Sequence, residues 1–333
     1  MSNSNIPVSV LNLVPVRKGE GDKEAIDAMV DLAQATEKMG YSRYWIAEHH
    51  NAAALVSSAT SILIKHTLEN TEKIRVGSGG IMLPNHSPLI VAEQFGTLET
   101  IYPKRVDLGL GRAPGTDMST ANALRRSQHE SVYTFPQDVN DLLRYFGPEE
   151  KQEFVKAFPG VGRNVPLYIL GSSTESAILA AKLGLPYAFA SHFAPTYLGE
   201  ALSIYRNNFK PSEYLDEPYV ITCLGVVAAE TDEEAEFEAT TMLQRSLYMT
   251  RRGRHPLYPP VENMDDLWNE SEKQMVLAKH RMTLVGSKDS IRTQLKEFQA
   301  RYNADEVMAV TYIYDRDKQK RSYEILKEVV DGK

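Results

Sequence analysis

The residues best suited to chemistry end a predicted strand in the run Ile46-Ala-Glu-His-His-Asn51. Side chains alternate along an extended strand, so Glu48 and His50 are expected on one side and His49 on the other. This geometry is poor for a metal ion and no other His, Cys, Asp or Glu cluster lies nearby in the sequence, so we predict no metal site. We interpret one of the two histidines as a general acid–base near neutral pH. The alternative is that both only hydrogen-bond neighbouring loops.

Glycines dominate the end of the next predicted strand, in the stretch from Arg75 to Pro88. Gly77, Gly79 and Gly80 lie within four residues of one another. Glycine weakens a strand unless another backbone or a flat ligand must come close. The adjacent pair could therefore leave a backbone shelf for a planar ring, or it could form a bend that only eases packing.

Two later segments could bind an anion. Arg112 lies in the run Gly109-Leu-Gly-Arg-Ala-Pro-Gly115, where its guanidinium suits phosphate or carboxylate, the alternative being a surface salt bridge. The run Leu170-Gly-Ser-Ser-Thr-Glu-Ser176 opens a predicted helix whose N-terminal N–H groups favour an anion, the alternative being simple capping by a serine. A flat seat, a histidine, an arginine and a phosphate cup together describe a site for FMN. The cup would be formed by Gly171, Ser172, Ser173 and Ser176.

Strand-like and helix-like segments alternate along the whole chain, which favours a (β/α)8 TIM barrel with loop insertions, formed as a single domain by residues 1–333. A doubly wound open sheet is the alternative. In a barrel of this type the active site lies at the carboxyl ends of the strands, where all the residues above fall. The predicted strands are Pro7–Val16, Arg43–Glu48, Ile74–Leu83, Arg105–Leu110, Val165–Leu170, Tyr187–Ser191, Tyr219–Ala228 and Glu306–Tyr314.

Composition excludes several classes of partner and location. The 333 residues carry 37 basic and 44 acidic side chains, a net charge of −7, which argues against nucleic acid or an anionic membrane as the main partner. The single cysteine, Cys223, excludes an intrachain disulfide. The sequence has no evident signal peptide and no apolar run of about 18 residues, so we expect a cytoplasmic protein.

The motifs taken together resemble the bacterial luciferase-like, flavin-dependent monooxygenase family, and within it single-subunit bacterial members. The resemblance extends from about Ile6 to Val330. It implies a TIM-type barrel, reduced FMN supplied by a separate flavin reductase, O₂, a small-molecule substrate and a homodimer. The runs that carry it are WIAEHHN, VGSGGIMLPNHSPLIVAEQFGTLE, YPKRVDLGLGRAPGTD, YILGSSTESAILAAKLGLP and FASHFAP, with LVGS further on.

The resemblance also assigns roles to individual residues. It implies that Gly79-Gly80 lies against the isoalloxazine ring, often through a non-prolyl cis peptide, and that His49 is the catalytic histidine. The phosphate would be held by Arg112 with Ser172, Ser173 and Ser176.

Three departures from luciferase argue against light emission and its aldehyde substrate but leave flavin binding intact. The luciferase dipeptide bears methyl groups where this chain has two glycines. Its carboxylate corresponds here to the hydroxyl of Ser172, and its reactive cysteine to Gly111.

The resulting hypothesis is a monooxygenase in which reduced FMN and O₂ form a C4a-peroxide that oxidises a small organic molecule, such as a carbonyl compound, while His49 shuttles a proton. The alternatives are hydride transfer with the deazaflavin F420 and a non-enzymatic flavin carrier or sensor. The polar stretch Arg251 to Asp266 is interpreted either as a lid over the flavin bearing Arg251, Arg252 or His255, or as a solvated loop.

Overall fold

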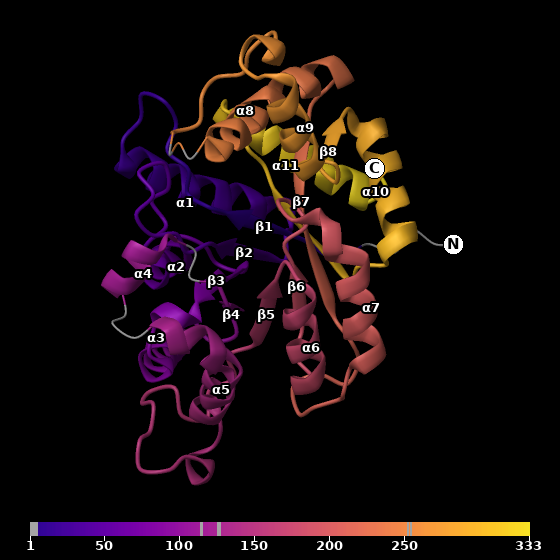
Figure 1. The fold of residues 1–333 in the computed structure, drawn as a ribbon. Coiled ribbons are helices and arrows are strands. Elements are labelled where there is room, and N and C mark those ends of the chain that lie inside the picture. The colour runs from indigo at the N-terminus through magenta and orange to yellow at the C-terminus, as the bar shows by residue number, and fades with distance from the viewer. Residues whose placement is uncertain (1–5, 114–115, 125–127, 252, 254) are drawn as a thin grey trace.

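A closed barrel of parallel strands forms the centre of the molecule (Figure 1). The computed structural model describes residues 6–113, 116–124, 128–251, 253 and 255–333. Among these residues nine strands pair in the order β6-β5-β4-β3-β2-β1-β9-β7-β8, and β6 also pairs with β7, which closes a ring of eight. This confirms the predicted (β/α)8 barrel and excludes an open sheet. The strands are β1 Val8–Asn12, β2 Arg43–Ile46, β3 Arg75–Met82, β4 Val106–Gly111, β5 Leu167–Gly171, β6 Tyr187–Phe189, β7 Val220–Ala228, β8 Leu284–Gly286 and β9 Glu306–Val310.

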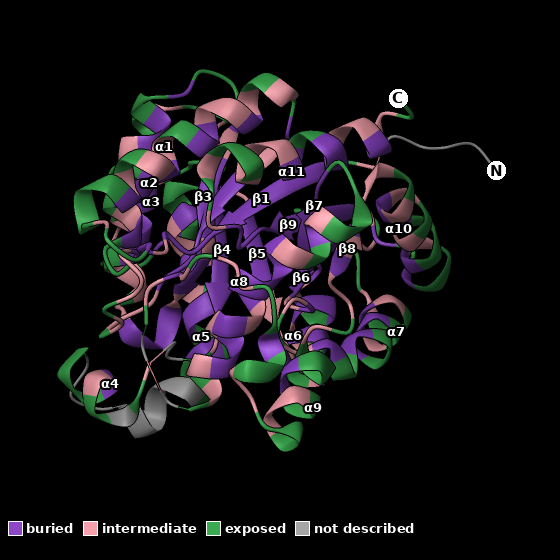
Figure 2. Ribbon diagram, turned by 90° about the horizontal axis from the view of Figure 1, so that it is seen from above, coloured by how far each residue is buried: buried purple, intermediate pink, exposed green. Residues whose placement is uncertain are grey.

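Helices surround the buried sheet on all sides (Figure 2). Their ends follow local signals: α1 stops at Gly40, which has the left-handed φ of 82°, and α8 begins where the Thr231 side chain accepts a hydrogen bond from the Glu234 N–H. The helices are α1 Asp22–Met39, α2 Thr60–Glu69, α3 Pro88–Ile101, α4 Met118–Leu124, α5 Gln128–Phe146, α6 Thr174–Leu183, α7 Leu198–Asn208, α8 Asp232–Thr250, α9 Glu270–Lys279, α10 Lys288–Tyr302 and α11 Arg316–Val330, with short 3₁₀ turns η1 Leu83–Asn85, η2 Glu149–Lys151, η3 Pro195–Tyr197 and η4 Met264–Asp266.

The predicted strands correspond to the observed ones, with differences at their ends. The first and last of them, predicted to reach Val16 and Tyr314, stop at Asn12 and Val310, where the chain leaves the sheet. Helix α5 contains Pro136, a residue that normally ends a helix. Helices α4 and α9 and the short strand β8 were not predicted.

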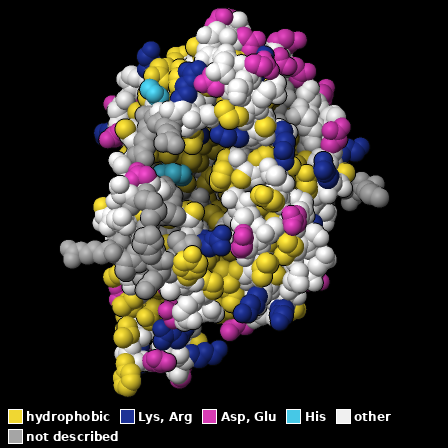
Figure 3. Space-filling model, in the orientation of Figure 1, with side chains coloured by type: hydrophobic (Ala, Val, Ile, Leu, Met, Phe, Trp, Pro, Cys, Tyr) yellow, Lys and Arg dark blue, Asp and Glu magenta, His cyan; other side chains and the backbone are white. Residues whose placement is uncertain are grey.

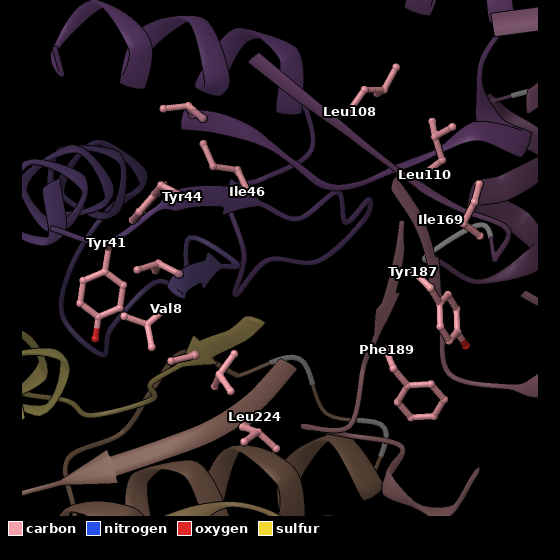
Figure 4. Packing of buried hydrophobic residues seen from close by; sticks show 14 of the residues in the cluster. Val8, Tyr41, Tyr44, Ile46, Leu108, Leu110, Ile169, Tyr187, Phe189 and Leu224 are labelled. Atoms are coloured by element: carbon pink, nitrogen blue, oxygen red, sulfur yellow. The ribbon is translucent and has the colours of Figure 1, made fainter. Parts of the chain in front are cut away.

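Every barrel strand is buried on both faces, as a parallel sheet covered by helices requires. Outward-facing side chains such as Tyr44, Leu108 and Ile169 pack under the helices in one continuous cluster (Figure 4). Inward-facing side chains, among them Trp45 and Tyr168 with ring centroids 4.9 Å apart, fill the barrel itself. The barrel is therefore a packed core, and a ligand must bind at one of its ends.

An ion-pair network closes the amino end of the barrel. The Arg43 guanidinium donates to Glu306 Oε1 at 2.8 Å and to Asp107 Oδ2 at 2.9 Å, and Arg75 Nη2 donates to Asp107 Oδ1 at 2.6 Å. Both carboxylates are fully buried, so their charges depend on these partners. The network fills the amino end, which leaves the carboxyl end free for a site. Within the described part of the chain, no helix is both long enough and apolar enough to cross a membrane.

Candidate functional site

The carboxyl ends of neighbouring strands β2 to β6 align closely. Ile46 pairs with Ser78, Met82 with Gly111, and Gly111 in turn with Leu170. The loops that follow these strands therefore emerge side by side and carry the histidines, the glycine pair, Arg112 and the serines to one end of the barrel. Figure 3 shows the molecule hollowed over the centre of the barrel, with hydrophobic side chains in the hollow.

The buried Glu48 carboxylate connects the segments that follow β2 and β3 through hydrogen bonds. It accepts hydrogen bonds from His50 Nε2 at 2.7 Å, His86 Nε2 at 2.9 Å, the Met82 N–H at 2.9 Å and Asn85 Nδ2 at 3.2 Å. Burial alone would raise the pKa of Glu48, but the hydrogen bonds from His50, His86 and Met82 lower it to about 2. Glu48 and His50 thus share one side of the chain, as the alternation along the strand predicts.

His86 is a neighbour that the sequence did not indicate, because it lies on the loop after the next strand. The ligand atoms of Glu48, His50 and His86 lie within 4.8 Å of one another, a separation that a metal ion could bridge. The Glu48 carboxylate is already used by the Met82 N–H and the Asn85 amide, so hydrogen bonds account for the cluster without an ion.

Replacing Glu48 with glutamine is expected to lower the free energy of unfolding by about 2 kcal/mol at pH 7, because the amide loses the charge that these donors stabilise. The folded-state pKa lies below the ordinary value of 4.5, so the stabilisation is complete above pH 4.5 and is lost as the pH falls towards about 2. Urea unfolding of both proteins from pH 7 to pH 3 would measure this. If the difference in free energy of unfolding between the wild-type protein and the variant did not become smaller below pH 4.5, the prediction would be contradicted.

His49 lines a cavity of about 210 Å³ at the barrel mouth, together with its neighbour His50. The Nδ1 atom of His49 is buried and has no hydrogen-bond partner among the described residues. Burial, and next the positive charge of Arg245, lower the pKa of His49 to about 4. At neutral pH the imidazole is therefore uncharged, so each ring nitrogen can act only as a donor or only as an acceptor.

His192 and His280 lie in the same electrostatic environment as His49. Burial, followed by the charge of Arg245, lowers the pKa of His192 to about 3 and that of His280 to about 4. His192 Nδ1 and His280 Nε2 are buried without hydrogen-bond partners among the residues that the structure describes. No local pattern groups these histidines in the sequence, because they come from widely separated loops.

The three neutral histidines should make the protein sensitive to acid. Unfolded histidine binds a proton below about pH 6.5, whereas these side chains in the folded protein stay neutral until about pH 4 or lower. The contribution of these histidines to the free energy of unfolding is therefore fully present above pH 6.5. It falls as the pH approaches 4, by up to about 1.4 kcal/mol per pH unit for each histidine. We expect a free energy of unfolding at least about 2 kcal/mol lower at pH 5 than at pH 7. The double variant His192→Asn with His280→Asn should show a shallower dependence, and an unchanged slope would refute the assignment.

The glycine pair lies where the pairing of β3 with β4 is interrupted, between Ser78 and Ile81. The peptide bond between Gly79 and Gly80 is cis. A Cβ at Gly80 would lie 2.8 Å from the Gly109 carbonyl oxygen, and one at Gly79 would lie 2.7 Å from Leu11 Cδ1. Packing thus accounts for both missing side chains, in line with the second of the two interpretations from sequence. Gly79 is nevertheless only half-buried, and a role as the seat of a ring stays a prediction.

The predicted anion cup is assembled from the ends of β4 and β5. Arg112 Nη2 lies 3.8 Å from Oε2 of Glu175, which is in the first turn of α6, and Ser173 is the N-cap of that helix. Hydrogen bonding to Ser173 and to its own backbone N–H, with a smaller effect from Arg112, lowers the pKa of Glu175. Half-buried Ser172 lies in the same loop.

Ser176 and Gly171 contact each other beneath the loop that joins β5 to α6. The buried Ser176 hydroxyl donates to the Ser173 carbonyl oxygen at 3.0 Å and lies 3.1 Å from the Tyr187 hydroxyl. A Cβ at Gly171 would lie 1.7 Å from Ser176 Oγ, so glycine is required there. The Ser176 hydroxyl is thus bonded within the protein, and a role of Arg112, Ser172, Ser173 and Ser176 in holding a phosphate stays a prediction.

Part of the stretch Arg251 to Asp266 borders the cavity, through Gly253, His255 and Leu257. His255 lines the cavity with its ring centroid 4.8 Å from that of Tyr248. The Leu257 backbone donates to Val16 and accepts from Lys18, which joins the stretch to the loop after β1. Arg251 instead pairs with Glu272 at 2.7 Å, away from the cavity, and Arg252 lies outside the described residues. Of the side chains proposed to reach inwards, His255 does so.

Helix α8 contributes side chains to the cavity that the sequence analysis missed. Arg245, Tyr248 and Met249 line it from one helix face. Their spacing of three and four residues is the signal that could have grouped them, since such positions are neighbours on a helix. Nothing in the sequence showed that this face would meet His49.

Comparison with known proteins finds similarity over nearly the whole chain. A family model described as luciferase-like monooxygenase matches residues 6–303. The uncharacterized protein YddN of Bacillus subtilis is 53% identical over 324 residues, covering 97% of this chain and 96% of the relative. A luciferase-like monooxygenase of Escherichia coli K12 is 46% identical, covering 99% and 98%. An N-acetyl-S-alkylcysteine monooxygenase of Bacillus subtilis is 30% identical, covering 98% of each.

Solved structures share the fold. Apo-MsnO8 superposes with a TM-score of 0.87 at 32% identity and covers 98% of both chains. The oxygenating constituent of 3,6-diketocamphane monooxygenase from Pseudomonas putida, solved in complex with FMN, has a TM-score of 0.72 at 16% identity, with 98% of both chains covered. An F420-dependent secondary alcohol dehydrogenase has a TM-score of 0.66 at 14% identity, covering 98% of this chain and 99% of the other.

Proposed function

The chain belongs to the luciferase-like monooxygenase family, and from this premise we propose that it uses reduced FMN and O₂ to oxidise a small organic molecule. The observation that carries the proposal is the meeting of two features at one barrel mouth. One is an anion cup made by Arg112 and the start of α6. The other is a cavity lined by His49, whose imidazole is neutral at pH 7 and whose Nδ1 has no hydrogen-bond partner among the described residues.

The residues at the mouth suit FMN in their chemistry. Arg112 offers a permanent, forked cation, and the first turn of the ten-residue helix α6 offers backbone N–H groups, the combination that phosphate prefers. The 3.8 Å pair between Arg112 and Glu175 is long and solvent-exposed, so a phosphate could replace it at little cost. When bound, reduced FMN would supply the electrons that activate O₂.

Each residue then has a defined task. Arg112, Ser172 and Ser173 would hold the phosphate, and the main chain at Gly79-Gly80 would lie along the ring. His49, neutral at physiological pH, would take up and return a proton during the reaction. The segment joined through Leu257 to the loop after β1 would limit access of water from that side.

FMN is favoured over F420 because relatives that are 46% and 30% identical are named monooxygenases, and a structural neighbour was solved with FMN. The F420-dependent neighbour shares the fold at lower similarity. In line with the family resemblance, we further propose delivery of reduced FMN by a separate reductase, and a homodimeric, cytoplasmic protein that folds as one barrel domain.

The proposal is tested by titrating the full-length protein with reduced FMN under anaerobic conditions and then mixing it with O₂. A transient absorbance that differs from free oxidised FMN is expected, together with FMN affinity lowered roughly 30- to 100-fold in Arg112→Ala, as for loss of a charge-assisted phosphate contact. Arg206→Ala, on the distant helix α7, is the matched control and should bind FMN normally. Retention of F420 but not FMN, or reoxidation identical to that of free flavin, would count against the proposal.

A further inference from the structure

Arg245 is, among the described residues, a cation without a counter-ion. It lines the cavity at the barrel mouth together with His49. Within the same part of the chain it has no hydrogen bond and no ion pair, and its side chain lies against an aromatic ring. A half-buried guanidinium normally recovers its lost hydration through a carboxylate or a carbonyl group. The missing partner is therefore a sign that a ligand completes the site.

The guanidinium is held in place rather than free to move into solvent. Its Cζ atom lies 4.3 Å from the centroid of the buried Tyr312 ring, within the range of a cation–π contact. Tyr248 and Met249 follow it on the same helix face. The ring contact leaves all five N–H donors of Arg245 available, in the planar arrangement that suits a carboxylate.

The surroundings make an anion the better occupant. The described residues that line the cavity include one carboxylate, Asp117, which accepts hydrogen bonds from Asn51 at 3.3 Å and from Thr120 at 3.0 Å. Its charge is thus shared with Thr120 and with Asn51 of the loop after β2. His49, which lines the cavity with Arg245, is neutral at pH 7, because burial and then this guanidinium lower its pKa to about 4. The positive charge of Arg245 is therefore not neutralised by the described residues that line the cavity.

The remaining walls limit the size and polarity of the occupant. Apolar side chains come from Pro15, Ala52, Ala54, Leu55, Met249 and Leu257. The cavity volume of about 210 Å³ is below the roughly 300–1,000 Å³ of pockets for drug-sized ligands. A small molecule with an apolar body and one anionic end matches both the walls and the charge.

We propose that Arg245 binds the carboxylate of the substrate, and that the protein acts on small organic acids with an apolar chain. The inference rests on the proposed function, since it takes this cavity as the place where the substrate is oxidised. It goes beyond that function by naming the substrate class and a specificity-determining residue. A carboxylate held by Arg245 fixes one end of the molecule in the cavity that His49 also lines.

The test compares charged and uncharged probes on the full-length protein, with and without FMN. Straight-chain carboxylates from butanoate to octanoate, each beside its primary amide, would be titrated at pH 7.5 and followed by ligand-observed NMR. We expect at least about tenfold tighter binding of the acid than of the amide, as for one charge-assisted hydrogen-bonded pair. The preference should disappear in Arg245→Met and persist, weakened, in Arg245→Lys. Arg251→Met is the matched control, because Arg251 pairs with Glu272 outside the cavity.

Two results would overturn the inference: equal binding of acid and amide to the wild-type protein, or a preference for the acid that survives in folded Arg245→Met. FMN titrations of the same samples separate this inference from the proposed function. Loss of FMN affinity in Arg245→Met as severe as in Arg112→Ala would assign the guanidinium to the cofactor and also overturn the inference. Failure of the wild-type protein to bind FMN, with the preference for the acid intact, would sink the proposed function alone.

Discussion

Replacing His49 with alanine is expected to lower the rate of substrate oxidation by about 10²–10⁴-fold, the usual effect of losing a general acid–base. His49 lines the cavity, and its pKa of about 4 leaves the imidazole unprotonated at pH 7, which is the state that a proton acceptor needs. Single-turnover product formation, with reduced FMN bound before O₂ is added, would measure the effect for a compound that the wild-type protein oxidises. FMN affinity should be unchanged, because the phosphate donors lie on other loops.

Two further measurements distinguish proton transfer from a structural role of His49. Added imidazole should restore part of the rate in His49→Ala, and the acid limb of the wild-type pH profile, near pH 4, should be absent from the variant. His50→Ala is the matched control. His50 is bound to Glu48 at 2.7 Å, so its loss should reduce stability more than rate. Equal loss of rate in both variants, without rescue, would refute the assignment of His49.

Sequence reasoning succeeded where the signal was local and periodic. Alternation along the chain just after β2 correctly placed Glu48 and His50 on one side, where they share a hydrogen bond, although His50 lines the same cavity as His49. The regular succession of strands and helices gave the closed barrel, and the strand order then brought the predicted segments to one end. The first inference depends on backbone geometry that one short segment determines by itself. The second depends on the order of such segments along the chain.

Sequence reasoning failed where partners come from distant loops. His86 meets Glu48 through the loop after β3, and Arg245 reaches the His49 cavity from α8, nearly two hundred residues along the chain. The pair Gly79-Gly80 is a second case in which the packing could not be read from the sequence. Its spacing suggested room for a ligand, but the Cβ positions are closed by Leu11 and by the backbone at Gly109. Local spacing shows that something must come close to glycine, and only the packed structure shows what it is.

Replacing Gly80 with alanine is expected to lower the free energy of unfolding by about 3–5 kcal/mol, at the upper end of overpacking effects. The added Cβ would lie 2.8 Å from the Gly109 carbonyl oxygen and 3.0 Å from Leu170 Cδ2. Gly109 cannot yield, because its own Cα faces the Ser78 carbonyl oxygen, 2.3 Å from where a Cβ would be. Strands β3 and β4 would therefore have to separate beside the proposed flavin seat. Urea unfolding and FMN titration would record the loss of stability and of affinity together.

Two other glycines show whether backbone contact is the cause. Gly79→Ala should cost less, about 1–2 kcal/mol, because its first obstacle is the flexible end of the Leu11 side chain. Gly199→Ala, in helix α7, should be neutral or slightly stabilising, since its Cβ would lie 3.7 Å from Tyr302 and alanine favours a helix. The expected order of destabilisation is thus Gly80, then Gly79, then Gly199. If Gly79→Ala destabilised the protein more than Gly80→Ala, this explanation would be wrong. The contact between β3 and β4 would then not be what excludes a side chain at Gly80, and contacts at the barrel mouth would have to account for the effect.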